Sequence, residues 1–519
     1  MPSADSAEWE LPRLRTSFIF QDDCKYLYAD DQQASQDLAE FFDVKFYPYN
    51  PPGSPPIFAA TSKKHAVICR LTQPTDKDTN PCEIIQLIRD DGSGDGANCA
   101  SCWSRDPDTH EPWLCVAGND ANVKVYNVKQ GKLVRTLVGH GGGINDLATS
   151  PDNPLIIASA SADTTVRIWS LAKAHEKQPC VCILGGEGHS YDLLSVAFHD
   201  NGRYVLSAGH DQVINLWALP EFPSHHTDVP AVIYYPHFSS SEIHNNLVDC
   251  VAFHGDLILS RACHEDSIVL WQIEGFSSSD PIPDPLSAPT PTDMAKQTRS
   301  YFTPTLSQSR PAMFTRLAQF HTPDCGVQFF MRFRMFHAPG KHPILAFANA
   351  KSRTFFWDFR RFGEYKRYIE ELKEAGGKNI GGREVQKPSW LMVKRGKKTA
   401  ASGVAAVVGD GTSSLRSFAL SGAGGDKESM VSASPDPESS TTGLAYSRET
   451  LQAWAEMYDL SDPVGYVKAH RSLQIDGGFV GRQVGWSPDG EWCVVVGNGN
   501  RALIYQRWGK EKGVTTQIA

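Results

Sequence analysis

The stretch GHGGGINDLATSPDNPLIIASASADTTVRIW, residues 139–169, decides the fold because the chain repeats it. Residues 188–217, GHSYDLLSVAFHDNGRYVLSAGHDQVINLW, keep the same order of Gly-His, β-rich run, turn, second strand, Asp turn and a strand ending in Trp. The distance from His to Trp is 29 positions in the first copy and 28 in the second, and the copies begin 49 residues apart. Near-copies at this interval predict a repeat architecture.

Four residue types recur in order in both copies. They are His140, Ser159, Asp163 and Trp169, followed by His189, Ser207, Asp211 and Trp217. Each set is expected to form one buried hydrogen-bond chain from indole to hydroxyl to imidazole to carboxylate, which satisfies polar groups and fixes a turn. His, Ser and Asp also form catalytic triads, but a hydrolase needs only one. We therefore interpret both sets as structural.

Weaker copies extend the repeat along the chain. They occupy residues 57–71, 114–127, 248–271, 329–359 and 484–508. With the two clear copies they predict an all-β fold: a seven-bladed WD40 β-propeller with an N-terminal arm and a long insertion before the last blade. A ring must close or its edge strands stay unpaired. We expect residues 40–49, EFFDVKFYPY, to pair with the last blade and close it.

The segments between the repeats set the expected domain boundaries. These are an N-terminal arm at 1–39, blades one to six at 40–362, an insertion at 363–477, the last blade at 478–510 and a C-terminal tail at 511–519. In the insertion, the spacing of Tyr365, Ile369 and Leu372 predicts a helix at 363–377. A second helix is expected at 449–460, and the Gly-, Ser- and Ala-rich residues 399–445 are expected to be disordered.

Composition excludes several classes of protein. A net charge of −9 argues against a general nucleic-acid binder. No apolar run reaches the length of a membrane-spanning helix, and the acidic N-terminus lacks the features of a secretory signal. The 12 cysteines are scattered through apolar runs, which indicates reduced thiols. The pair Cys99 and Cys102 lacks a second ligand pair, so we expect neither a metal nor a cofactor.

One basic run stands out in the insertion. It consists of Lys394, Arg395, Lys397 and Lys398. These side chains either lie in a solvated loop or make a weak contact to DNA phosphates or an acidic partner through charge attraction.

Four runs between the repeats resemble the extra sex combs / embryonic ectoderm development (EED) family. They are residues 138–146, 184–198, 234–263 and 329–333. The third, YYPHFSSSEIHNNLVDCVAFHGDLILSRAC, is the most specific because it is not general WD40 sequence. The resemblance covers about residues 40–360 and 478–508 and indicates a divergent, fungal-type member.

The resemblance implies a role, because the fold alone hosts many functions. It implies a non-catalytic nuclear scaffold of Polycomb repressive complex two that contributes to gene silencing. Such a protein binds a helix of the SET-domain methyltransferase subunit on one face and contacts other Polycomb subunits. On the other face it binds the trimethylated histone H3 tail, which stimulates the catalytic subunit. No membrane partner is implied.

The resemblance also implies where trimethyl-lysine binds. The family uses four aromatic residues at the propeller mouth, and three match Phe58, Phe329 and Phe330. Cys99 stands at the fourth position, where an aromatic residue is expected, and a thiol cannot supply a face for a quaternary ammonium. Arg332 is expected to contact the peptide backbone or to be an ordinary surface charge. Adjacent strand residues point to opposite faces, so Phe329 and Phe330 both line the site only if a bulge turns them, and otherwise belong to the core.

Two other functions compete with this interpretation. Another WD40 interaction adaptor, such as a ubiquitin-ligase substrate receptor, would need an adaptor-binding element, and residues 1–40 contain none that we recognise. An enzyme would need a nucleophile or cofactor motif. The sequence shows no Gly-rich phosphate loop, HExxH or GxSxG.

Overall fold

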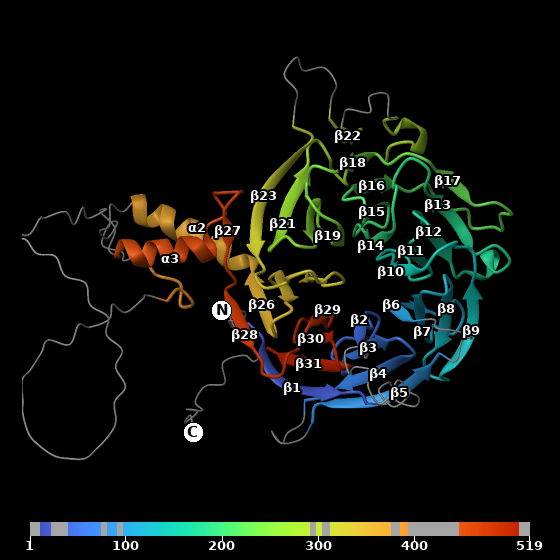
Figure 1. Ribbon diagram of the computed structural model, residues 1–519, viewed down its shortest axis with the longest axis horizontal. Helices are drawn as coiled ribbons and strands as arrows, with labels where there is room; N and C mark the ends of the chain where they lie inside the picture. Colours follow the sequence, from blue (N-terminus) through green and yellow to red (C-terminus); the bar gives the residue numbers. More distant parts are fainter. Residues whose placement is uncertain are drawn as a thin grey trace, which may run out of the picture. The chain divides into compact units, whose positions relative to one another are not determined.

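The chain folds into a ring of seven β-sheets around a central channel (Figure 1). The computed structural model describes residues 11–21, 40–73, 80–90, 97–290, 297–303, 312–374, 385–392 and 446–507. The predicted seven-bladed, mostly β fold is confirmed. The chain divides into two compact units, one of residues 1–364 with 456–519 and one of residues 365–455. The ring belongs to the first unit.

Each blade runs from an inner strand beside the channel to an outer strand at the rim. Blade 1 contains β2 (Phe41–Phe46), β3 (Ile57–Ser62), β4 (His65–Leu71) and β5 (Cys82–Arg89), and blade 2 contains β6 (Asn98–Arg105), β7 (Pro112–Gly118), β8 (Val123–Asn127) and β9 (Lys132–Leu137). Blade 3 contains β10 (Ile144–Thr149), β11 (Ile156–Ser161), β12 (Val166–Ser170), β13 (Cys180–Leu184) and β17 (Ala231–Ile233). Blade 4 contains β14 (Leu193–Phe198), β15 (Tyr204–Gly209), β16 (Ile214–Ala218), β18 (Phe238–Ser240) and β22 (Thr298–Ser300).

The remaining blades follow the same plan. Blade 5 contains β19 (Val248–His254), β20 (Leu257–Ala262), β21 (Ser267–Ile273), β23 (Phe314–His321) and β27 (Tyr466–Val467). Blade 6 contains β24 (Arg334–Phe336), β25 (Ile344–Ala348), β26 (Arg353–Asp358) and β28 (Arg471–Gln474), and blade 7 contains β29 (Gly481–Trp486), β30 (Trp492–Gly497), β31 (Arg501–Gln506) and β1 (Arg13–Ile19). The described helices are η2 (Lys173–His175), η3 (Pro285–Ser287), α2 (Phe359–Glu374) and α3 (Arg448–Tyr458). None of these helices is both long and apolar enough to cross a membrane.

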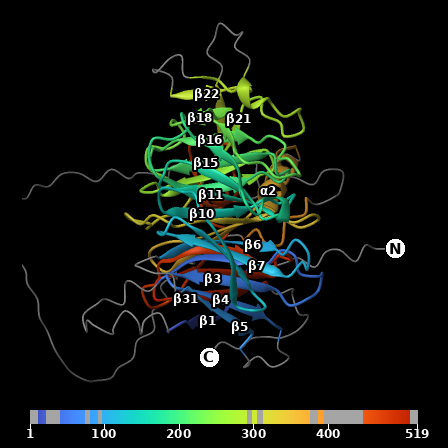
Figure 2. The same ribbon diagram turned by 90° about the vertical axis from the view of Figure 1, so that its right-hand side faces the viewer.

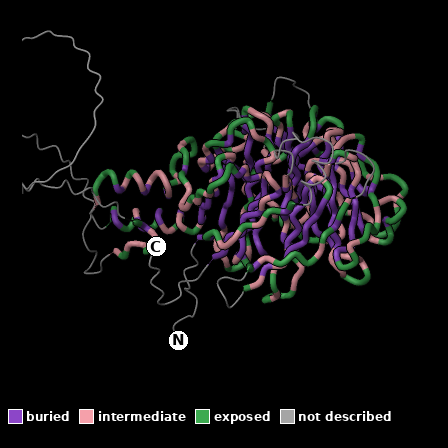
Figure 3. Tube along the Cα trace, turned by 60° about the horizontal axis from the view of Figure 1, so that its bottom comes forward, coloured by how far each residue is buried: buried purple, intermediate pink, exposed green. Residues whose placement is uncertain are grey.

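The core lies between neighbouring blades. One apolar cluster joins Leu206 and Leu216 of blade 4 to Val251 and Trp271 of blade 5, and equivalent clusters join the other neighbours. Seen from the side, strands of successive blades lie next to one another around the ring (Figure 2). Burial is concentrated in these strands, while the connecting loops are exposed (Figure 3). Apolar burial between sheets is therefore the main force that holds the ring together.

Ring closure differs from the sequence-based expectation. The closing strand is β1, which pairs antiparallel with β31 from Arg13 opposite Gln506 to Ile19 opposite Arg501. The predicted segment 40–49 instead contains β2, the inner strand of blade 1, and within this segment only Glu40 forms a β-bridge to blade 7, opposite Asn498. The prediction was wrong because β2 is buried along most of its length, which suits the centre of the ring, whereas β1 has the exposed pattern of a rim strand.

The insertion boundaries also differ from the prediction. Helices are present at both expected places, as α2 and α3. The end of the predicted insertion, however, returns to the ring, because β27 pairs with β23 of blade 5 and β28 pairs with β26 of blade 6. Residues 399–445, expected to be disordered, and the tail 511–519 lie outside the described residues.

The smaller unit has its own polar contacts. The hydroxyls of Tyr368 and Tyr446 lie 2.8 Å apart, and the Trp454 indole donates to the Met392 carbonyl at 2.7 Å. These bonds fix α2 and α3 to the described segments between the two helices.

The structure brings together both predicted hydrogen-bond chains. In blade 3, His140 Nδ1 lies 2.7 Å from Asp163 Oδ2 and His140 Nε2 lies 2.7 Å from Ser159 Oγ, which accepts a 2.8 Å bond from the Trp169 indole. In blade 4 the corresponding distances are 2.9, 2.8 and 2.8 Å. Although burial opposes ionisation, the hydrogen bonds from His140, Thr165 and the Gly141 amide hold the pKa of the Asp163 carboxyl well below its usual range.

A third chain of this kind was not predicted. In blade 5, His244 lies 2.6 Å from Glu265 and 2.7 Å from Ser260, and Ser260 accepts a 3.0 Å bond from the Trp271 indole. Sequence comparison missed it because Glu replaces Asp and no Gly precedes the His. The spacing of a Ser eleven residues before a terminal Trp was the available signal.

Replacing Ser159 by Ala tests the role of these chains. The variant leaves the Trp169 indole N–H and His140 Nε2 without their buried partner, so the free energy of unfolding should fall by roughly 1–3 kcal/mol. Urea unfolding followed by tryptophan fluorescence measures the change. Ser190 is exposed, and Ser190→Ala is the control for loss of a serine hydroxyl at the surface. Equal stability of Ser159→Ala and the parent protein would contradict a structural role.

His470 anchors the return of the chain into blade 6. Its Nδ1 accepts a 2.9 Å bond from the Asp358 amide, and its Nε2 donates a 2.9 Å bond to the Met457 carbonyl. Burial lowers the pKa of His470 to about 3, so the folded protein holds this ring neutral. Protonation would break the bond from Asp358, because that nitrogen would become a donor.

This arrangement predicts acid sensitivity from a single residue. The pKa of His470 is lower in the folded than in the unfolded chain, so the unfolded state binds the proton first and stability falls as the pH drops below about 6.5. Between pH 7 and pH 5, His470 should remove about 2 kcal/mol of unfolding free energy. Urea unfolding of the parent protein and His470→Asn at both pH values measures it. The variant should lose less stability on acidification, and an unchanged pH dependence would contradict a buried neutral ring.

Candidate binding site at the mouth of the channel

Six of the seven inner strands begin with the same irregularity. In β2, β6, β10, β14, β19 and β29, the pairing with the second strand slips between the first and third residues. A bulge of this kind leaves one residue out of the ladder and re-aims its side chain. The residues at these positions are Phe42, Cys99, Asn145, Leu194, Asp249 and Arg482. We call the end of the channel where they lie the mouth.

Hydrogen bonds between blades hold the bulges at one level of the ring. The Ser101 amide donates to Asp43 Oδ2 at 2.8 Å, and the Met331 amide donates to Asp249 Oδ2 at 3.1 Å. Two further junctions are made the same way, from the Val196 amide to Asp146 Oδ2 and from the Val251 amide to Ser195 Oγ. Residues from separate blades therefore meet at the mouth.

Phe329 and Phe330 lie together just before the inner strand of blade 6. Their ring centroids are 4.9 Å apart, and Phe329 is 42% exposed. Phe330 has φ of +56°, a left-handed backbone that bulky residues rarely adopt. This conformation breaks the alternation of a regular strand and explains how neighbouring side chains come to lie side by side, outside the buried core clusters.

Arg482 clamps this pair from blade 7. Its Nη1 donates to the Phe329 carbonyl at 2.8 Å, and its Nε and Nη2 each bind one carboxylate oxygen of Glu40 at 3.0 Å. The Arg482 carbonyl accepts a bond from the Arg332 amide at 2.8 Å. The start of blade 1 and the segment before blade 6 are thus tied together through one guanidinium.

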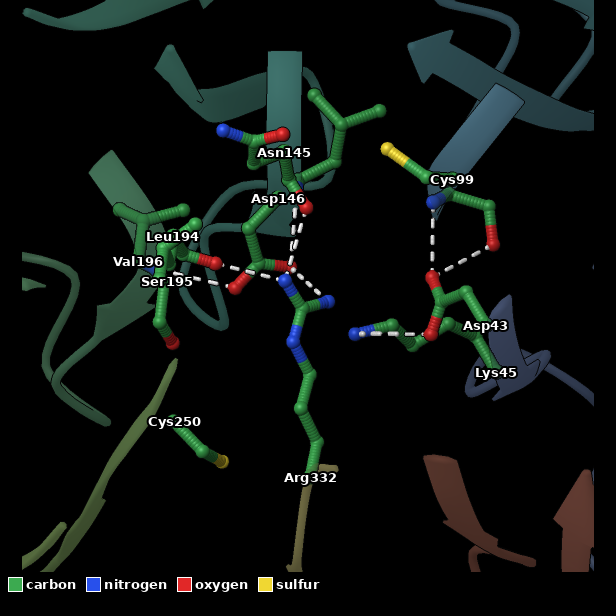
Figure 4. Close-up of polar contacts among 12 residues, drawn as sticks. Asp43, Lys45, Cys99, Asn145, Asp146, Leu194, Ser195, Val196, Cys250 and Arg332 are labelled. Atoms are coloured by element: carbon green, nitrogen blue, oxygen red, sulfur yellow. Dashed lines mark hydrogen bonds and ion pairs between the residues drawn. The ribbon is translucent and has the colours of Figure 1, made fainter. Parts of the chain in front are cut away.

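Arg332 extends into the channel (Figure 4). Its Nη1 donates to Asp146 Oδ1 at 3.2 Å, and its Nη2 donates to the carbonyls of Asn145 at 2.8 Å and Leu194 at 2.7 Å. The residue is 4% exposed, so the alternative that it is an ordinary surface charge is wrong, and its guanidinium is already bound inside the channel. The chain turns this side chain inward because Asp146 and two carbonyls supply acceptors there.

The charge of Arg332 is compensated inside the channel. Burial alone would lower the pKa of its guanidinium, but the carboxylates of Asp146 and Asp43 raise it. The guanidinium carbon also lies 5.3 Å from the centre of the Phe330 ring, at a distance typical of a cation–π contact. Arg332 therefore supports Phe330 from within.

Phe58 does not lie with the other aromatic candidates. It is 0% exposed and packs 5.4 Å from the Phe46 ring in the blade 1 core. Because β3 runs antiparallel to β2 and Phe58 pairs with Phe46, it sits at the far end of the inner strand from the mouth. Its prediction as a wall of the site is wrong. The apolar run around it marked a core strand.

Phe42 is the residue that sequence comparison missed. It is half-buried at the bulge of β2, between the buried Phe41 and Asp43. It occupies in blade 1 the position that Cys99 occupies in blade 2. The available signal was the run Phe41-Phe42-Asp43, in which a second aromatic residue precedes a buried carboxylate.

Cys99 contributes no aromatic face at its position in the mouth. Its Sγ lies 3.2 Å from the Ile144 carbonyl, and burial raises the pKa of this thiol to about 12. The nearby Cys102 is buried within β6. Among the residues with a described position, no group of three or more His, Cys, Asp or Glu is arranged to hold a metal ion.

A cavity of about 580 Å³ occupies the part of the channel beyond Arg332. It is lined by the C-terminal halves of the inner strands, including Lys45, Trp103 and His254, and by Arg332 and Asp146. The Arg332–Asp146 pair thus separates the mouth from this cavity. The basic run Lys394, Arg395, Lys397 and Lys398 lies outside the described residues.

The mouth combines exposed or half-buried aromatic rings with few free charges. Phe42, Phe329 and Phe330 supply the rings, and the charges of Arg332 and Arg482 are already paired. Aromatic faces attract a cation through their quadrupoles, most effectively a cation with no hydrogen-bond donors. The chemistry of the mouth suits a methylated ammonium better than a free amine.

Two family models match the chain. The model for the WD domain, G-beta repeat, matches residues 131–170 and 178–218. The model for the Polycomb protein EED insertion domain matches residues 408–459.

The chain is similar over its whole length to a protein of Chaetomium thermophilum named Polycomb protein EED. The two are 73% identical, and the match covers 99% of each. Polycomb protein esc of Drosophila melanogaster is 36% identical over 33% of this chain and 43% of that protein.

Solved structures show the same likeness. A chain in the crystal structure of the Chaetomium thermophilum polycomb repressive complex 2 is 73% identical with a TM-score of 0.84, and the match covers 98% of this chain and all of that one. A chain from the same complex with H3K27me3 and H3K27M is 72% identical with a TM-score of 0.84, at the same coverage.

Proposed function

The chain belongs to the Polycomb protein EED family, as a fungal-type member, and from this premise we propose that it is the non-catalytic WD40 subunit of a Polycomb-type histone H3 lysine methyltransferase complex. It reads histone tails that carry trimethyl-lysine. Binding of the tail stimulates the catalytic subunit, and the complex contributes to gene silencing. Whole-length similarity to a chain solved together with H3K27me3 supports this role.

The aromatic pair at the mouth is the observation that carries the proposal. Phe329 and Phe330 lie side by side in a strained turn, with Arg332 and Arg482 holding them from within the ring. Strained backbone persists only where its surroundings over-determine it, and such sites are often functional. Each ring that faces a quaternary ammonium contributes about 0.5–2 kcal/mol.

Phe42 is the third wall in this proposal, in place of Phe58. Its position at the bulge of β2 matches that of Cys99 in β6, so both residues border the same opening. Because Cys99 has no ring, the site has three aromatic walls of phenylalanine. Phenylalanine is a weaker cation–π partner than tryptophan, so binding should be of modest affinity.

Peptide binding tests the proposed site. The purified full chain should bind an H3K27me3 peptide more tightly than the same histone H3 peptide without methylation. Phe330→Ala and Phe42→Ala should each lower that preference by about tenfold, because each removes one ring. Isothermal titration calorimetry measures both affinities.

Phe58→Leu is the matched control, because Phe58 lies in the core at the other end of the blade. It should lower stability and leave the preference for the methylated peptide unchanged. Equal binding of both peptides by the parent protein would contradict the reader function. A loss of preference in Phe58→Leu alone would contradict the placement of the site.

Cys99→Tyr should strengthen the site. Tyrosine would add the missing fourth face, and affinity for the trimethylated peptide should rise by about threefold to tenfold. Cys99→Ala is the control and should leave affinity unchanged, since the thiol supplies no face. The same affinity for both variants would place Cys99 outside the site.

We also propose binding partners other than the histone tail. A helix of the SET-domain methyltransferase subunit binds the face opposite the mouth, and other Polycomb subunits contact the ring. Contact of Lys394, Arg395, Lys397 and Lys398 with DNA phosphates remains a prediction from sequence. A role at chromatin follows from membership of a Polycomb complex, and we place the protein in the nucleus. A ubiquitin-ligase adaptor is not favoured, because the similar full-length protein is a Polycomb protein.

A further inference from the structure

A fully buried ion pair lies in blade 5 next to the aromatic turn. Arg261 on β20 and Asp249 at the bulge of β19 are both inaccessible to solvent. Arg261 Nη1 lies 2.8 Å from Asp249 Oδ1 and 2.7 Å from Oδ2. Removing two charges from water costs free energy that their mutual attraction often fails to return. Stability alone therefore does not account for this pair.

Asp249 also makes a second contact, outside its own blade. Its Oδ2 accepts a 3.1 Å bond from the Met331 amide, across the junction to blade 6. Met331 directly follows Phe330, whose left-handed backbone is unfavourable for a phenylalanine. The carboxylate thus holds the first peptide group after the strained residue.

The peptide groups before Phe330 are held as well. The Cys263 thiol lies 3.4 Å from the Gln328 carbonyl, and Arg482 Nη1 lies 2.8 Å from the Phe329 carbonyl. Asp249 completes this set from the other side. Without it, the peptide group that directly follows Phe330 would have no partner, and the turn would rely on the contacts of Arg332 on that side.

Other junctions between blades show that an ion pair is not needed merely to join them. The Val251 amide is held by the neutral hydroxyl of Ser195, at 3.1 Å. The Asp146 carboxylate, paired with Arg332, holds the Val196 amide, which no left-handed residue directly precedes. The Asp249–Arg261 pair differs in that both side chains are 0% exposed and the amide held by Asp249 directly follows a left-handed phenylalanine.

We propose that Asp249, oriented by Arg261, is a positioning residue that fixes Phe330 in its left-handed conformation and so sets the selectivity of the mouth for trimethyl-lysine. The inference rests on the proposed reader function. Neither residue touches the peptide. Both act through the Met331 amide.

Two double variants separate positioning from general stability. Asp249→Leu with Arg261→Met removes the charges and the acceptor, while Asp249→Asn with Arg261→Met removes the charges and keeps a side-chain oxygen for the Met331 amide. Asp249→Asn with Arg261→Met should unfold at a temperature close to that of the parent, because replacing a buried ion pair by uncharged residues of similar size is often neutral. Asp249→Leu with Arg261→Met also leaves the buried Met331 amide without an acceptor, so its unfolding temperature should fall about as far as that of Ser159→Ala. Calorimetry gives the preference of each full-length variant for the H3K27me3 peptide over the unmethylated peptide.

The preference for the trimethylated peptide should fall about tenfold in Asp249→Leu with Arg261→Met. Asp249→Asn with Arg261→Met should retain most of it. Ser159→Ala serves as a destabilised control with an intact mouth and should keep the preference. If Asp249→Leu with Arg261→Met gives no folded protein, Asp249→Val with Arg261→Leu makes the same comparison.

The outcomes are distinguishable. A parent protein that binds both peptides equally would overturn the reader function itself. A parent that prefers the methylated peptide, together with equal preference in the variants with and without the acceptor, would overturn the positioning role alone. A preference that falls in step with unfolding temperature across all variants, Ser159→Ala included, would likewise reduce Asp249 and Arg261 to structural residues.

Discussion

Burial between neighbouring sheets is the constraint on which the rest of the ring depends. Each apolar cluster draws side chains from two blades, so no blade can bury both of its faces alone. The ring must therefore be complete before any part of it is fully stable. Pairing of β1 with β31 supplies the last contact and joins the two ends of the chain in one sheet. The positions of the residues at the mouth depend on this closure, because they come from different blades of the closed ring.

The site is assembled from starts of strands that are remote in sequence. Phe42 belongs to blade 1, Cys99 to blade 2 and Phe330 to the start of blade 6, and Arg482 of blade 7 bridges the last to the first. A bulge at nearly every inner strand re-aims one residue per blade. Four of these residues keep partial exposure at the opening, namely Phe42, Cys99, Asn145 and Arg482, whereas Leu194 and Asp249 are buried. The fold therefore supplies both the residues that line the mouth and those that support it from the same position in successive blades.

The sequence predicted the parts of the structure that repeat. Two near-copies with the same His-to-Trp spacing, together with their weaker relatives, were enough for the blade count, for the class of fold and for the residues of two hydrogen-bond chains. Family resemblance located Phe329, Phe330 and Cys99, because short motifs fix their alignment. It failed for Phe58, because an apolar run does not distinguish a core strand from a lining strand. The expected closing strand was wrong, because strand pairing across the whole chain leaves no local pattern. The side chain of Arg332 points into the channel because its hydrogen-bond acceptors lie in blades 3 and 4. These acceptors are far from Arg332 in the sequence, so the residues around it could not predict this orientation.

Closure by β1 has a consequence for the synthesis of the protein. The strand that ends the assembly leaves the ribosome first, while its partner β31 leaves almost last. At about 5–20 residues per second, the interval is on the order of half a minute or longer. Throughout that time, Arg13–Ile19 has no partner strand, because the other strands of blade 7 are synthesised last. Most residues of β1 are exposed, and they include Arg13 and Arg15. Charged, exposed side chains of this kind oppose aggregation of an unpaired strand before β31 is available.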